Sequence, residues 1–411
     1  MKRKIRNSIA LKKIIENQYK EYFGAVKLST IAFYTSNALR GYRQGVIVIA
    51  SFILLFSSTL YAQALSETNS GSGVRNKAEQ FSNNEINTSV VDEEIYSNMP
   101  LWPDFQNGKA WSITLENDIF TGDDDGVTNV IGFQIAHGAF DRFTPHNLPD
   151  WLYWLVGNSY INRKDNHKRG VVYVFGQVIQ TPKDILSSEP ILNDLPYAGL
   201  LISSATLYSA GQTVTDKLSL WGGVIGPLSF AEETQTFIHS LIGSDIPNGW
   251  DNQLSNEPVL MVEAGKVLRV FATPEQHKLE FDTLLSGDIS FGNFRSSINV
   301  TAIVRVGNNL TISYPFSSIL PDRQVNPLAF SDLSSWYLFA GFQSAYVANN
   351  ILLNGNTFTD SQSLPLDHTL FRSSVGIGTN YGKWAFSFLY SEIIFTDHPD
   401  PFGSISITRR F

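Results

Sequence analysis

Hydrophobic and polar residues alternate along most of the chain after Lys109, and a period of two is typical of β-strands rather than of helices. The segment 297–307 shows the pattern most plainly, because apolar residues fall on one face and polar residues on the other. The apolar positions are Ile298, Val300, Ala302, Val304 and Val306, and the polar positions include Ser297, Asn299, Thr301 and Arg305. The segment 279–291 repeats the pattern, with Glu280, Asp282 and Asp288 on its polar face. We expect strands with one apolar and one water-facing surface.

About twelve segments alternate in this way, and most exceed the roughly five or six residues usual in soluble sheets. They are 109–116, 129–138, 169–178, 199–210, 217–226, 258–271, 276–292, 295–308, 333–347, 368–381, 383–396 and 402–411. Strands of about ten residues suit a tilted crossing of some 30 Å of hydrocarbon. Near their ends stand Trp111, Trp336, Tyr346, Tyr381 and Trp384, where membrane barrels carry aromatic girdles.

The pattern therefore predicts an all-β fold, a transmembrane antiparallel β-barrel of about twelve strands. Closure removes the unpaired strand edges that lipid would not tolerate. The chain also ends on Phe411, with Ile405 and Ile407 alternating behind it, as in terminal strands recognised during outer-membrane assembly; Arg409 departs from that pattern. The alternative is a large soluble β-sandwich, which would alternate as well.

The N-terminal region predicts export. Arg40 and Arg43 precede an apolar run at 45–60, and Ala62 and Ala64 follow it in the small-x-small spacing of a signal peptidase site. The run is short for a spanning helix, although an uncleaved anchor is the alternative. We expect residues 1–64 to be an export signal with a long basic N-terminal region, 65–105 a flexible polar arm, and 106–411 the barrel domain.

Charge separates these regions and narrows the possible functions. Residues 1–64 hold ten basic and two acidic residues, whereas the remainder holds 20 basic and 36 acidic ones, within a total net charge of -8. An acidic mature chain excludes a nucleic-acid-binding protein, whose contact surface would be basic. Charged residues make up only 17% of the chain, and the absence of cysteine excludes disulfides, thiolate nucleophiles and cysteine metal sites.

The alternation breaks between about 227 and 257, where a short helix is expected in a loop. Ser229 and Glu232 have the spacing of a capping box, and Gly243 is a suitable C-terminal stop. Gln235 and His239 are four residues apart and so share one face of this helix. A loop that only connects two strands does not need a helix with paired polar side chains such as Gln235 and His239.

Oxygen-bearing side chains form a second concentration near the first predicted turn. Asn117 and Asp118 end one strand, three aspartates follow at 123–125, and Thr128 enters the next strand. Closely spaced carboxylate, amide and hydroxyl oxygens suit a hard cation such as calcium, although the spacing is not that of an EF-hand. For the three aspartates, a solvated loop is an equally good interpretation, while Asn117 and Asp118 are expected to be ligands.

Five motifs in order carry a family resemblance that extends from Lys109 to Phe411: LENDIF (115–120), VTNVIGFQIAHG (127–138), NDLPYAGLL (193–201), GPLSFAEETQTFIHSLIG (226–243) and NGWDNQLSNEP (248–258). Together they resemble the lipid A 3'-O-deacylase family of Gram-negative outer membranes. The resemblance implies a twelve-stranded barrel in the outer membrane, with a calcium-dependent active site between the barrel wall and a helical extracellular loop. It implies lipid A, within lipopolysaccharide of the outer leaflet, as substrate. A deacylase that acts on single lipids does not require assembly, so we expect a monomer.

The resemblance also implies roles for individual residues. His239 matches the catalytic base that activates a water molecule, Gln235 its helical neighbour, and Asp245 a carboxylate that is usually Glu. Asn117, Asp118 and Thr128 match the calcium site, where the ion would stabilise the oxyanion. Lys183 is the nearest match to a basic residue that contacts lipid A phosphate. The segment 194–197 reads Asp-Leu-Pro-Tyr, where Asp-Arg-Pro-Tyr is more usual.

Two other functions remain open. One is an esterase like the outer-membrane phospholipase A, which uses a Ser nucleophile two residues after its His; no His-x-Ser occurs in this chain. The other is a non-enzymatic barrel or pore, which would line its lumen with charges. Neither a pore nor a structural barrel requires the helix that carries Gln235 and His239.

Overall fold

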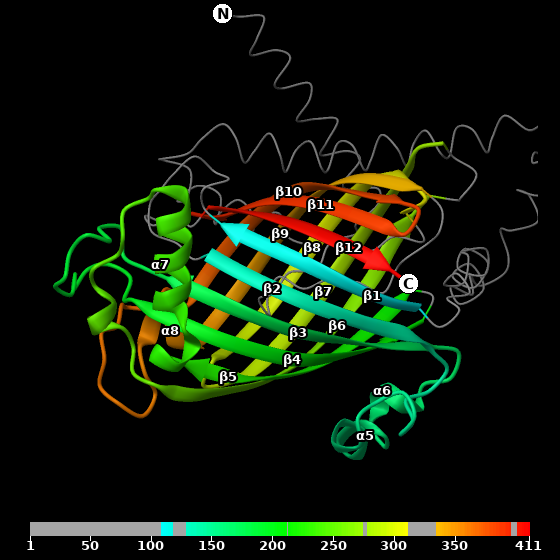
Figure 1. The fold of residues 1–411 in the computed structure, drawn as a ribbon. Coiled ribbons are helices and arrows are strands. Elements are labelled where there is room, and N and C mark those ends of the chain that lie inside the picture. Colours follow the sequence, from blue (N-terminus) through cyan, green and yellow to red (C-terminus); the bar gives the residue numbers. More distant parts are fainter. Residues whose placement is uncertain (1–107, 118–128, 212, 274–277, 311–333, 396–400) are drawn as a thin grey trace, which may run out of the picture. The chain divides into compact units, whose positions relative to one another are not determined.

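A computed structural model describes residues 108–117, 129–211, 213–273, 278–310, 334–395 and 401–411. Within them, twelve antiparallel strands form one closed barrel in which each strand pairs with its sequence neighbours and β1 pairs with β12 (Figure 1). The predicted fold class and strand number are therefore confirmed. The predicted export signal (1–64) and polar arm (65–105) lie outside the described residues and stay predictions.

The strands follow the predicted segments closely, with shifts of a few residues at their ends. They are β1 Gly108–Asn117, β2 Asn129–Phe140, β3 Lys168–Gln180, β4 Ala198–Ala210, β5 Val214–Ile225, β6 Glu257–Ala272, β7 Glu280–Gly292, β8 Arg295–Asn308, β9 Ser335–Asn350, β10 Thr369–Tyr381, β11 Trp384–Ile394 and β12 Phe402–Arg410. Short helices interrupt the connections: α5 Asp150–Val156, α6 Tyr160–Arg163, η3 Pro227–Ser229, α7 Ala231–Ile242, η4 Trp250–Asn252 and α8 Ile351–Asn354. None of the described helices is both long and apolar enough to cross a membrane.

The alternation sorts the side chains as expected. Polar and charged residues such as Asp282, Asn299 and Arg305 are buried toward the lumen, whereas Ile289 and Val300 are exposed on the outside of the wall. This arrangement, with polar residues inside and apolar residues outside, is that of a barrel whose outer surface meets lipid.

Ion pairs fill much of the lumen. Lys217 from β5 contacts Glu263 from β6 and lies 2.7 Å from Asp288 of β7. The Arg305 guanidinium donates to Asp282 from the neighbouring strand with an Nε–Oδ1 distance of 2.8 Å. These groups are almost completely buried, so they brace the strands against one another across the barrel interior.

The two ends of the barrel differ. β1 begins and β12 ends at one end, which we call the terminal end, and α5 and α6 lie outside the wall near it (Figure 1). The opposite end, which we call the α7 end, carries η3, α7, η4 and α8 (Figure 1). The α7 end brings together the segments in which the sequence analysis placed the site.

Candidate active site

A sharp turn after β5 folds the chain back onto the outside of the barrel wall. Gly226 has a φ of 101°, and a Cβ there would lie 2.6 Å from the main-chain nitrogen of Asn256, so the turn requires glycine. Its N–H donates to the Gly199 carbonyl at 2.8 Å. Gln177, which faces outward from β3, donates from Nε2 to the Ser229 carbonyl at 2.6 Å. These contacts fix η3 and the start of α7 against β3 and β4.

The beginning of α7 differs from the prediction. Ser229 lies in η3 rather than at the N-cap, and the cap is Phe230 in the left-handed conformation (φ 57°) without a side-chain cap hydrogen bond. The proposed capping box is wrong because the tight turn places the Ser229 side chain against Gly199 and buries it there. The predicted stop is confirmed: Gly243 adopts φ 75°, and its N–H donates to the His239 carbonyl.

A buried stripe on α7 faces the barrel. Ala231 and Gln235, one turn apart, are 1% and 4% exposed, and His239 continues the stripe with partial exposure. The Gln235 side-chain oxygen accepts a buried hydrogen bond of 3.0 Å from the Trp250 indole N–H. Trp250 in turn packs against Tyr197, with ring centroids 5.0 Å apart. The helix is therefore held in position by an indole that comes from the same loop.

The immediate surroundings of His239 define its tautomer. Nδ1 lies 2.6 Å from the main-chain carbonyl oxygen of Asp245. A carbonyl oxygen can only accept, so Nδ1 donates its proton and Nε2 of the neutral ring keeps a lone pair. The structure thus brings His239 and Asp245 together, but through the main chain of Asp245 rather than through the carboxylate that the family resemblance implies.

The expected calcium ligands are only partly described. Asn117 ends β1 and is 7% exposed; its side-chain amide donates to the side-chain oxygen of Asn129 at the start of β2. Asp118 and Thr128 lie outside the described residues. No group of three or more His, Cys, Asp or Glu that could hold a metal occurs in the described part of the chain. Amide oxygens are ligands that calcium accepts, so Asn117 and Asn129 fit the ion in chemical type.

These two sets of residues lie at the same end of the barrel. β2, which carries Asn129, pairs with β3, and α7 packs against β3 and β4. The Asn117–Asn129 pair therefore borders the wall that α7 covers, because β2 is adjacent to β3.

Lys183 lies in the neighbouring loop and is exposed. Its main-chain N–H donates to the Asp194 carboxylate at 2.9 Å, and the N–H of Leu195 donates to the other oxygen of Asp194 at 2.7 Å. Asp194 thus shapes this loop through main-chain contacts. Tyr197, at the end of the loop, donates to the Ile185 carbonyl at 3.1 Å, and burial raises the pKa of its phenol, which keeps it a neutral donor.

The exposed side of α7 is divided between an apolar and a polar sector. Phe237, Ile238, Leu241 and Ile242 form the apolar sector beside the buried stripe, with Leu241 73% exposed. Glu232, Glu233, Thr236 and Ser240 lie on the opposite side. A helix of this kind suits a membrane interface, with its apolar side toward acyl chains and its polar side toward water.

Trp250 and Gln177 received no site role from the sequence. Their importance lies in contacts with partners distant in the chain, and residue type alone did not reveal those contacts. Among the other histidines, His137 pairs in register with Lys109 at the start of β1 and thus lies at the terminal end, far along the strand from Asn129.

Comparisons with known proteins bear on the family and the fold. The protein-family model described as "Outer membrane protein LpxR" matches residues 78–411. The solved structure of LpxR from Salmonella typhimurium is 18% identical, with a TM-score of 0.59 over 73% of this chain and 99% of that chain. The β domain of the Bordetella autotransporter BrkA is 9% identical over 74% of this chain and 99% of that chain, with a TM-score of 0.37. The comparison with curated protein sequences found no match.

Proposed function

The chain belongs to the LpxR family of outer-membrane proteins, and from this premise we propose that it is a calcium-dependent esterase that removes the 3'-O-linked acyl group of lipid A. The substrate would be lipopolysaccharide in the outer leaflet, and the chain would act as a monomer. The single observation that carries the proposal is the orientation of His239 on a helix fixed against the outside of the barrel wall.

His239 would be the general base. With its Nδ1–H engaged by the Asp245 carbonyl, the Nε2 lone pair can accept a proton from water. The resulting hydroxide attacks the acyl carbonyl carbon, the bond from that carbon to the sugar oxygen breaks, and the proton passes to the departing oxygen. The products are a free carboxylic acid and a sugar hydroxyl.

Gln235 would position His239 rather than touch the reacting atoms, because its side-chain oxygen accepts from Trp250. Asn117, with Asp118 and Thr128, would hold calcium, which when bound would supply positive charge beside the oxyanion of the transition state. Lys183 is exposed in the neighbouring loop and is proposed as a contact for a lipid A phosphate.

The position of α7 supports a substrate that arrives sideways from the membrane. The helix lies outside the wall rather than over the lumen, and its exposed apolar sector (Phe237, Ile238, Leu241 and Ile242) would lie among acyl chains. A lipid can therefore reach His239 without leaving the leaflet.

A pore is disfavoured by the interior of the barrel. Lys217, Glu263, Asp282 and Arg305 are each buried within ion pairs in the lumen, where a channel would present hydrated charges. The outer-membrane phospholipase A type of esterase is the second candidate, because the same apolar sector could receive a phospholipid.

The test is mass spectrometry of lipid A from outer membranes that contain the full chain, with calcium and after chelation. We expect loss of one ester-linked 3' acyl group, abolished by chelation and by His239→Ala in a barrel that still inserts. Intact lipid A together with cleaved phospholipid would assign the chain to the phospholipase type, and deacylation that persists in His239→Ala would refute the proposed base.

A further inference from the structure

The connection between β2 and β3 is a folded unit with its own apolar core. The connection packs Phe143 and Leu148, which precede α5, and Leu152, Val156 and Ile161 of the two helices against Val171 of β3 and against Ala205 and Leu207 of β4. Those wall residues face outward, since they alternate with lumen-facing neighbours such as Thr206. This hairpin (141–167) therefore folds back over the outer surface of the barrel, a surface that faces lipid elsewhere.

The pairing of β3 with β2 and of β5 with β6 shows at which level of the barrel wall the hairpin lies. Tyr173, which packs against its core, pairs with Ile135 of β2, and Leu220, on the other flank, pairs with Val262 of β6. Ile135 and Val262 are 44% and 49% exposed on the outer wall. Because hydrocarbon must cover these two neighbours, the hairpin occupies a place at the same level as lipid.

An ion cluster ties the hairpin to the wall at the terminal edge of the barrel, four residues along β5 from Leu220. Asp216 faces outward from β5, yet its side chain is completely buried between Lys164, which follows α6, and Lys266 of β6. The Lys266 side chain is 57% exposed, so the cluster lies at the polar edge of the wall, beside the apolar level of Ile135 and Val262.

The far side of α5 is apolar as well. Leu152 and Val156 face the wall, whereas Trp151, Trp154 and Leu155, at one-turn spacing on the opposite side, are 56%, 81% and 49% exposed. Tyr160 at the start of α6 is also exposed. A helix that is apolar on both sides suits a lipid environment, and Trp and Tyr prefer the membrane–water interface.

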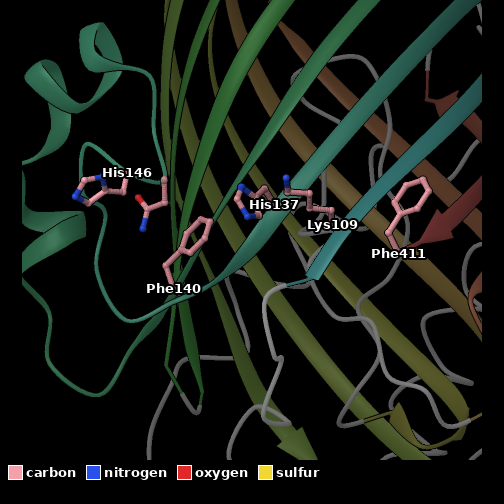
Figure 2. Close-up of a pocket in the computed structure, with 6 residues that line it drawn as sticks. Lys109, His137, Phe140, His146 and Phe411 are labelled. Carbon is pink, nitrogen blue, oxygen red and sulfur yellow. The ribbon is translucent and has the colours of Figure 1, made fainter.

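Polar groups lie beside the hairpin where headgroups would be expected. A cavity of about 550 Å³ is lined by His146 from the loop before α5 and by Lys109 and His137 from β1 and β2. Figure 2 shows His146 on one side of this cavity and the two strand residues on the other. Two residues farther along β1 toward the α7 end, Trp111 pairs with Ile135, so the polar residues Lys109 and His137 are followed by an apolar wall.

We propose that the α5–α6 hairpin is an interfacial anchor that inserts the Trp151, Trp154 and Leu155 face into phospholipids of the leaflet at the terminal end of the barrel. The occupant is the lipid surface itself, because the face continues the lipid-facing wall on both flanks. The inference is independent of the enzymatic reaction. Only the choice of leaflet rests on the proposed function: a site at the α7 end that acts on the outer leaflet places the terminal end in the periplasmic leaflet.

The chain contains no cysteine, so single cysteines can be labelled with a nitroxide without background. The full chain would be placed in nanodiscs of phosphatidylethanolamine and phosphatidylglycerol, with labels in Trp154→Cys and Leu155→Cys. Phe175→Cys, exposed on the lipid-facing side of β3, is the lipid reference, and Asp165→Cys, exposed after α6, is the aqueous reference.

We expect labels at 154 and 155 to collide more with oxygen than with a water-soluble nickel complex, as at 175, and the label at 165 to show the reverse. Nickel accessibility at both 154 and 155 equal to that at 165 would overturn the proposal. Dipolar broadening between labels at 154 in separate copies would also overturn it, because a second copy would then cover the face. The gel-mobility shift on heating verifies that each variant retains a folded barrel.

Discussion

The hydrogen bond between Trp250 and Gln235 offers the sharpest perturbation of the proposed site. Gln235→Met preserves the length of the side chain but removes the oxygen that accepts from the buried indole at 3.0 Å. The Trp250 N–H then has no acceptor in a region where Trp250 is 2% exposed. An unsatisfied buried donor costs about 1–3 kcal/mol.

That cost applies to the docking of α7 and not to the barrel, because the strands do not depend on this contact. The opening free energy of α7 should fall by the same amount, which corresponds to roughly 5- to 150-fold faster amide exchange. Hydrogen–deuterium exchange of peptides from 231–242 measures this directly, with peptides from β7 and β8 as the internal reference. Deacylation should decline in parallel, because His239 lies one turn beyond Gln235.

The double variant Gln235→Met/Trp250→Phe removes both partners. Replacing both ends of a buried hydrogen bond costs less than orphaning one end, so the double variant should lose less than the sum of the two single variants. Unchanged exchange of α7 in Gln235→Met, or strict additivity of the two substitutions, would refute the positioning role of this pair.

Three further outcomes are expected. Lys217→Met leaves Glu263 and Asp288 buried without their cation and should lower the free energy of unfolding in urea by about 3–5 kcal/mol. The pair of Lys168 with Asp141 is exposed, so Lys168→Met should change that free energy by less than about 1 kcal/mol. Equal effects of the two substitutions would contradict the account. Leu241→Gln should slow deacylation of lipid A in vesicles but not in detergent, while Ser240→Gln on the polar sector should change neither rate. Burial lowers the pKa of His167, which lies beside Ser209, Lys164, Arg169 and Asp216. The unfolded hairpin therefore binds a proton more readily than the folded one, and the stability of the hairpin should fall as the pH drops through about 6.5. Amide exchange of peptides from 150–163 should accelerate over that pH range, and an unchanged pH profile in His167→Gln would contradict the assignment.

The period-two pattern predicted the barrel well because each strand obeys a local rule. Residues such as Val300 and Asn299 alternate between lipid and lumen, and a register shift of one residue would exchange the two environments. The same rule gave no information on 141–167, where the α5–α6 hairpin was not predicted. Its helices are short, and its core depends on Val171 and Leu207 from strands that a local pattern cannot bring together.

The proposed site was predicted only in part for a related reason. The spacing of Gln235 and His239 placed both on one face of a helix, which the structure confirms. The partner of Gln235 is an indole fifteen positions later, and the partner of His239 is a main-chain carbonyl, which no residue type could signal. The capping box was wrong because the turn at Gly226 and the close approach to Gly199 determine where α7 begins.

The measurement that tests the central claim most directly uses the purified chain in vesicles that contain both lipid A and phospholipid, with calcium present. Mass spectrometry would follow both lipids for the wild type and for His239→Asn, which keeps a polar side chain but no basic nitrogen. The account predicts that lipid A alone loses an ester-linked 3' acyl group and that the variant, still a folded barrel, releases none. Release of fatty acid from phospholipid, or continued release from lipid A by His239→Asn, would contradict it.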